Sequence, residues 1–157
     1  MFRYMKIVTD YPTPYHGYAC DDQTEAALAD PHTGSPRLIL CDRALEDYGG
    51  IEKDYTGAPA VTCDSIGDTM SNRMATMGST LLHEYTHWQS LMVPPLDMAT
   101  TDMPNAYGAW GASHVQPKTD AIYNADTYSH YAMEVFWTNH CGHRFDNAVF
   151  DPDYYCL

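Results

Sequence analysis

A His-Glu-x-x-His motif, formed by His83, Glu84 and His87, is the part of this 157-residue sequence whose residue types and spacing best suit chemistry. On a helix, residues four positions apart lie on one face, so the two imidazoles can bind one metal ion while Glu84 stands beside it. Zinc is the metal expected from this arrangement. A zinc ion that keeps one coordination position open activates a water molecule, and Glu84 is placed to accept its proton. The motif therefore predicts a zinc-dependent hydrolytic site.

The hydrophobic pattern around the motif predicts the helix that must present it. Apolar side chains recur at three- and four-residue steps and form one stripe, roughly opposite His83 and His87. The stripe consists of Met70, Met74, Met77, Leu81, Tyr85, Trp88 and Met92. Pro94 and Pro95 would end the helix, because proline lacks the amide donor and crowds the preceding turn. We therefore expect an active-site helix over about residues 70–92, with one face on a core and the histidine face on a cleft.

Two short segments read as strands. Residues 37–41 are an apolar run bounded by Pro36 and Asp42, which predicts the clearest strand of the chain. Two interpretations of this strand are equally open: a free edge that binds an extended peptide, or an internal strand of the core. Residues 5–8 predict a second short strand, and the alanine-rich residues 24–29 predict a helical turn.

A second helix is expected in the last third of the chain. Tyr128, Tyr131, Ala132 and Val135 follow the i, i+3, i+4, i+7 pattern of a helical stripe. Residues 124–127 would begin this helix, which we expect over about residues 127–138. The segment 109–119 contains Gly111 and Pro117 and is expected to be irregular.

Charge and cysteine content exclude several classes of function. The chain has 21 acidic and 8 basic residues, a net charge of −13 and a pI near 4.6. Nucleic acids and anionic membranes select basic patches, so neither is expected as a partner. The five cysteines are widely spaced and include no Cys-x-x-Cys pair, which favours two disulfides and one odd thiol over a cysteine zinc site.

The length and composition predict a single secreted domain over residues 1–157, acting as a monomer. No apolar run approaches the length of a membrane span, and residues 1–4 do not open a signal peptide. We therefore expect a mature domain or fragment that lacks an N-terminal signal or pro-segment. The acidic composition also favours a cleft that prefers Lys or Arg next to the cleaved bond.

Two histidines leave a catalytic zinc one protein ligand short. The third histidine of the metzincins does not follow His87 at its usual spacing, which excludes that class. A carboxylate is therefore expected, and the loop that returns after Pro95 is the expected place for it. Sequence position alone leaves several candidates open, namely Asp97, Asp102, Asp120, Asp126 and Glu134. The histidines expected not to be ligands are His114, His130, His140 and His143.

Three ordered blocks of the sequence resemble the deuterolysin family of zinc endopeptidases, the aspzincins. The blocks are His83-Glu84-x-x-His87, Thr101-Asp102 leading to Tyr107-Gly108, and Tyr123-Asn124-Ala125-Asp126-Thr127-Tyr128. The resemblance implies a zinc ion held by His83, His87 and Asp102. It also implies that Tyr107 stabilises the oxyanion and that Asp126 is a buried acid near the histidines and the substrate pocket. Four residues separate Asp102 from Tyr107 here, whereas the family usually has two.

The residues and the resemblance together predict an α+β, zincin-like fold that is mainly helical, with a small β-sheet and an active-site helix. The expected function is that of a secreted zinc metalloendopeptidase, which hydrolyses polypeptides with zinc-activated water and Glu84 as the general base. The alternative is an extracellular zinc-binding or scavenging protein without proteolytic activity. Glu84 favours the enzyme, because a zinc carrier gains nothing from a general base beside its ligands.

Overall fold

The computed structural model describes residues 6–9, 26–29, 37–41 and 62–150, and within these ranges the chain is mainly helical. Three short strands, β1 (Lys6–Thr9), β2 (Ala26–Ala29) and β3 (Arg37–Leu40), form one sheet in the order β1-β3-β2. β1 runs parallel to β3, with Lys6 opposite Arg37, and β2 runs antiparallel to β3, with Ala26 opposite Leu40. The sheet is therefore built around β3.

The strand predicted at residues 37–41 is confirmed as β3, and Leu38 and Ile39 in it are almost fully buried. Because β1 and β2 occupy both edges of β3, its backbone is not free to bind a peptide, and the internal strand is the right alternative. The strand predicted at residues 5–8 is confirmed as β1, one residue further on. The helical turn predicted over residues 24–29 is wrong, because β2 occupies its last four residues. Pairing with β3 overrides the helical preference of alanine.

The prediction of one continuous helix over residues 70–92 is wrong, because the helix is broken twice. The chain forms a 3-10 helix η2 (Asn72–Met74), then α2 (Met77–Thr86) and α3 (Gln89–Met92). At the first break, the Thr76 hydroxyl accepts a hydrogen bond from the Ser79 amide, and the Ser79 hydroxyl accepts one from the Thr76 amide. This capping box satisfies amides that a helix start would otherwise leave unpaired. The second break is at Trp88, which has extended backbone and is 2% exposed.

The two breaks let one apolar stripe contribute to two separate cores. Met70 and Met74 pack with Met133 and Trp137 of the last helix in the larger cluster. Leu81, Tyr85 and Trp88 instead pack around Leu38 of β3. A straight helix would send the whole stripe to one side, whereas the broken path lets Met70 and Met74 join the helical core while Leu81, Tyr85 and Trp88 join the core beside the sheet.

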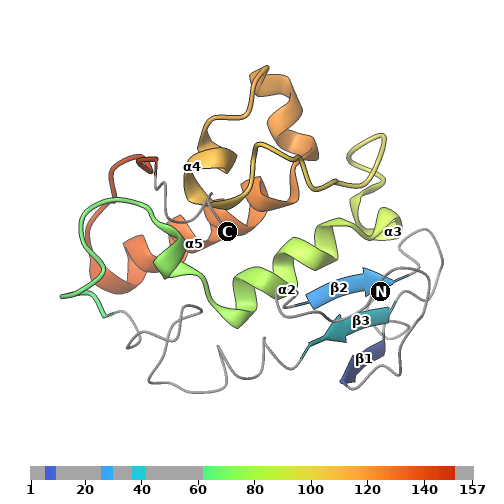
Figure 1. Cartoon of the computed structure of the whole chain (residues 1–157), viewed down its shortest axis with the longest axis horizontal. Helices are drawn as coiled ribbons and strands as arrows, with labels where there is room; N and C mark the ends of the chain where they lie inside the picture. The colour runs from blue at the N-terminus through green and yellow to red at the C-terminus, as the bar shows by residue number, and fades with distance from the viewer. Residues whose placement is uncertain (1–5, 10–25, 30–36, 42–61, 151–157) are drawn as a thin grey trace.

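The elements form layers in which α2 lies between the sheet and α5 (Ala125–Cys141), and α4 (Gly108–Ser113) packs against α5 (Figure 1). α5 confirms the second predicted helix and is slightly longer than residues 127–138. The expectation that residues 109–119 are irregular is wrong, since α4 and the 3-10 helix η3 (Lys118–Tyr123) occupy most of them. α4 is rich in small buried residues, which let it lie close to α5.

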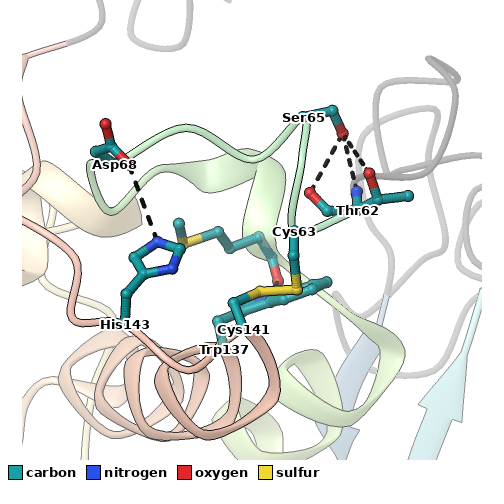
Figure 2. The surroundings of a disulfide bond; sticks show 8 residues. Thr62, Cys63, Ser65, Asp68, Trp137, Cys141 and His143 are labelled. Carbon is teal, nitrogen blue, oxygen red and sulfur yellow. Dashed lines mark hydrogen bonds and ion pairs between the residues drawn. A yellow bond between two sulfur atoms is a disulfide. The ribbon is translucent and has the colours of Figure 1, made fainter.

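A disulfide between Cys63 and Cys141 joins the segment before η2 to the end of α5 (Figure 2). Close to it, the indole Nε1 of Trp137 donates a hydrogen bond to the Met74 carbonyl at 3.0 Å. Cys41 is disulfide-bonded as well, so at least two bridges form, as the cysteine content predicts. Among the helices of the described ranges, none is both long enough and apolar enough to cross a membrane.

Candidate metal centre

The end of α2 presents the two motif histidines to the same point. His83 lies in the last turn of α2, and His87 is its C-terminal cap with helical backbone angles of φ −71° and ψ −15°. The one-turn spacing predicted by the motif is therefore kept although α2 ends here. The Nε2 atoms of the two rings are 3.3 Å apart.

Asp102 completes a triangle with these two nitrogens. Its Oδ1 is 2.9 Å from Nε2 of His83 and 3.2 Å from Nε2 of His87. Tetrahedral zinc with bonds of about 2.0–2.1 Å holds its ligand atoms about 3.3 Å apart. The triangle therefore has the size that one ion touching all three atoms requires.

Of the other carboxylates proposed from sequence position, Asp97, Asp120 and Glu134 do not belong to the triangle, and Asp126 contacts His83 only on the far side of its ring. Oδ1 of Asp97 accepts a hydrogen bond from the Tyr123 hydroxyl at 2.7 Å. Glu134 lines a hollow of about 170 Å³ beside His130, on the side where α5 faces α4. Within the described part of the chain, one group of three His, Cys, Asp or Glu side chains is close enough to share a metal ion. It consists of His83, His87 and Asp102. His114, His130, His140 and His143 do not belong to it.

Hydrogen bonds on the far side of each imidazole determine which nitrogen carries the proton. Nδ1 of His87 is 3.0 Å from the Thr100 carbonyl oxygen, and Nδ1 of His83 is 2.7 Å from Oδ1 of Asp126. A carbonyl and a carboxylate can only accept, so Nδ1 is the donor in both rings. In a neutral ring the lone pair then lies on Nε2, which faces the metal position.

The returning loop that carries Asp102 is attached to both neighbouring helices. The Thr100 amide donates to the Thr86 carbonyl at 3.2 Å, and the hydroxyls of these two buried threonines are 2.7 Å apart. One residue later, Thr101 forms a parallel bridge with Asn124 at the start of α5. The sequence does not predict the role of Thr100, because Thr100 contacts His87 through a backbone carbonyl that any residue type could supply.

Asp126 connects His83 to the segment that carries Tyr107. Its Oδ1 accepts from His83, and its Oδ2 accepts from the Gly108 amide at 2.7 Å. Gly108 has φ +68°, a left-handed conformation that glycine adopts without strain. Asp126 is 9% exposed, so both contacts lie largely away from water. Asp126 therefore sits behind the triangle and is not part of it.

The charged groups of the site shift one another's pKa values. Burial alone would lower the pKa of His83, but hydrogen bonds with Asp102 and Asp126 raise it to about 10. Burial would raise the pKa of Asp102, but the hydrogen bonds from His83 and His87 hold it well below its usual range. Three carboxylates, those of Asp102, Asp126 and Glu84, raise the pKa of His83, and Asp102 also raises the pKa of His87. This surplus of negative charge favours a cation between the rings.

Glu84 and Tyr107 lie within electrostatic range of the same centre. Glu84 is in the last turn of α2 and is 8% exposed, and its charge contributes to the raised pKa of both His83 and Tyr107. Burial, followed by the charges of Asp102, Asp126 and Glu84, raises the pKa of Tyr107 to about 12. Tyr107 is 40% exposed.

No protein-family model, no curated protein and no solved structure matches this chain.

Proposed function

We propose that the protein is a zinc-dependent metalloendopeptidase with a zincin-like fold of the deuterolysin type. The observation that carries the proposal is the triangle formed by Nε2 of His83, Nε2 of His87 and Oδ1 of Asp102. Two imidazoles and one carboxylate make a three-ligand set of the kind found in catalytic zinc sites, in which the fourth position stays open.

The donor atoms favour zinc over the common hard cations. Calcium and magnesium prefer oxygen ligands and take six or more of them, whereas imidazole nitrogen suits zinc and its neighbours in the first transition series. The oriented Nδ1 contacts to Thr100 and Asp126 support the same conclusion, because they prepare the imidazoles for metal binding.

The residues around the triangle can be given roles in peptide hydrolysis. Bound zinc would lower the pKa of a water molecule in its open position and polarise the scissile carbonyl. Glu84 would accept the proton of that water and return it to the leaving amine. Tyr107, with its pKa of about 12, stays protonated at neutral pH and would donate a hydrogen bond to the developing oxyanion. Asp126 would hold the orientation of His83.

The disulfide chemistry supports a location outside the reducing cytosol. A bridge such as Cys63–Cys141 persists in oxidising compartments, which fits a secreted enzyme that acts on extracellular polypeptides. The acidic groups at the centre and the net charge of −13 favour substrates with Lys or Arg near the cleaved bond. A peptide-library cleavage profile without any basic preference would remove that last proposal.

The Glu84→Gln variant separates catalysis from metal binding. Glu84 lies outside the ligand triangle, so the variant should keep one zinc ion per chain while casein cleavage falls by about 10²–10⁴-fold, the usual contribution of a general base. Glu134→Gln is the matched control, because it makes the same chemical change on α5 outside the triangle. It should leave both zinc content and cleavage unchanged.

Zinc content and peptide cleavage measured on the wild-type protein distinguish a peptidase from a zinc carrier. Cleavage that depends on Glu84 supports the peptidase. Zinc bound at one ion per chain with no cleavage of casein or of a peptide library would instead establish the carrier. Absence of stoichiometric zinc would contradict both.

A further inference from the structure

Asn124 is a fully buried polar residue at the start of α5 to which the metal chemistry assigns no role. It is 2% exposed and forms the N-terminal cap position of that helix. Its backbone lies beside Thr101 in a parallel bridge, made by the Thr101 amide to the Tyr123 carbonyl at 2.8 Å and by the Ala125 amide to the Thr101 carbonyl at 3.3 Å. The residue that follows Thr101 is the ligand Asp102.

The side chain of Asn124 contacts the other end of the same loop. Its Nδ2 donates to the Ala106 carbonyl at 3.2 Å and to Oγ1 of Thr127 at 3.2 Å. The residue that follows Ala106 is Tyr107. The backbone on either side of Asn124, at Tyr123 and Ala125, therefore holds Thr101, and the side chain of Asn124 holds Ala106. The loop that carries Asp102 and leads to Tyr107 is tethered at both ends to the start of α5, and Asn124 supplies the tether at the Ala106 end.

The middle of this loop lies at the surface. Pro104 and Asn105 are exposed, and the Ala106 amide closes a short turn onto the Met103 carbonyl at 2.9 Å. The middle residues can therefore change without disturbing buried contacts, whereas a shift at Thr101 or Ala106 would move a functional side chain.

We propose that Asn124 is the positioning residue that sets the separation between the metal ligand Asp102 and the phenol of Tyr107. This inference rests on the proposed metal centre. An amide suits the task because its NH₂ group carries two donors, one for each acceptor, whereas alanine leaves the buried Ala106 carbonyl without this donor. In an aspartate both side-chain oxygens are acceptors, so one of them would face that carbonyl and repel it.

Zinc affinity tests this role, with metal-free protein titrated against a chelator of known affinity. Asn124→Ala and Asn124→Asp should raise the zinc dissociation constant by about 10- to 100-fold, the range found when contacts outside the ligand shell are lost. The visible spectrum of the cobalt-substituted protein should change as well, because the ligand geometry relaxes. A purely structural residue would lower the melting temperature of the metal-free protein and leave the dissociation constant and the spectrum unchanged, and that result would overturn the proposal.

A second variant keeps the test decisive even where the Asn124 variants do not fold. Pro104→Ala combined with Asn105→Ala alters only the exposed middle of the loop, so its zinc dissociation constant should stay within about twofold of wild type. A tenfold loss in this variant would show that the loop itself sets the position of Asp102, and would refute the role of Asn124. Wild type that binds no zinc would refute the metal centre, whereas wild type and Asn124 variants that bind zinc equally would refute only the present inference.

Discussion

Replacing Asp102 with alanine tests which carboxylate completes the proposed metal centre. Its Oδ1 is 2.9 Å from Nε2 of His83 and 3.2 Å from Nε2 of His87, so the variant leaves the proposed site with two imidazoles and no third ligand. Asp97, five residues earlier, provides the control. Its carboxylate accepts a hydrogen bond from the Tyr123 hydroxyl and lies outside the triangle. The two variants remove the same charge from the same loop.

The expected zinc-dependent rise in melting temperature follows from the linkage between zinc binding and folding. Zinc at a hundred times its dissociation constant stabilises the folded protein by about 2.7 kcal/mol. For a chain of this length, 1 kcal/mol moves the melting temperature by about 2–4 °C, so wild type should gain about 5–11 °C. Loss of a direct ligand should weaken binding by more than the hundredfold seen for outer contacts. At the same zinc concentration, Asp102→Ala should then gain at most about 0.4 kcal/mol, or less than about 2 °C.

Thermal denaturation of metal-free protein, with and without added zinc, measures this difference directly. Wild type and Asp97→Ala should show the full zinc-dependent gain, and Asp102→Ala should show almost none. A full gain in Asp102→Ala, or loss of the gain in Asp97→Ala, would refute the assignment of the third ligand.

Three further predictions concern the phenol, pH and the disulfide. Tyr107→Phe should lower kcat for peptide cleavage by about 10²–10³-fold with little change in zinc affinity, and steady-state kinetics with an unchanged kcat would exclude Tyr107 as an oxyanion donor. The pKa of His83 in the folded metal-free protein is raised from 6.5 to about 10, so its contribution to stability is fully present below pH 6.5 and is lost as the pH rises towards 10. Melting temperatures measured in chelator should therefore fall across that pH range. A melting temperature that does not change with pH would contradict the pairing of the His83 imidazole with Asp102 and Asp126. The double variant Cys63→Ser, Cys141→Ser opens a link across 78 residues and should lose about 2–5 kcal/mol of unfolding free energy in urea, whereas a loss below about 1 kcal/mol would assign the bridge no stabilising role.

The part of the site that could be predicted from sequence is the part encoded by local spacing. His83 and His87 are one turn apart, and a single helical turn is enough to bring their rings together. Asp102 depends on the parallel bridge between Thr101 and Asn124, a contact between residues 23 positions apart in the chain. Local periodicity contains no information about that bridge, which is why position alone left several carboxylates open.

The errors in the predicted elements have the same physical origin. The stripe from Met70 to Met92 predicted one helix, but Thr76 and Ser79 form a capping box that starts a new one, and Trp88 leaves the helix to pack against Leu38. The Thr-x-x-Ser pattern was present in the sequence and could have been read as a helix start. The position of Trp88 could not, because it depends on the sheet. Residues 26–29 likewise became a strand only through their pairing with β3.

X-ray absorption at the zinc edge, combined with a zinc-loaded crystal structure, tests the metal centre most directly. We predict one zinc ion per chain, bound at about 2.0–2.1 Å by Nε2 of His83 and of His87 and at about 2.0–2.2 Å by a carboxylate oxygen of Asp102. Protein that binds no stoichiometric zinc, or zinc held by other residues while these two imidazoles turn away from each other, would contradict the proposed function.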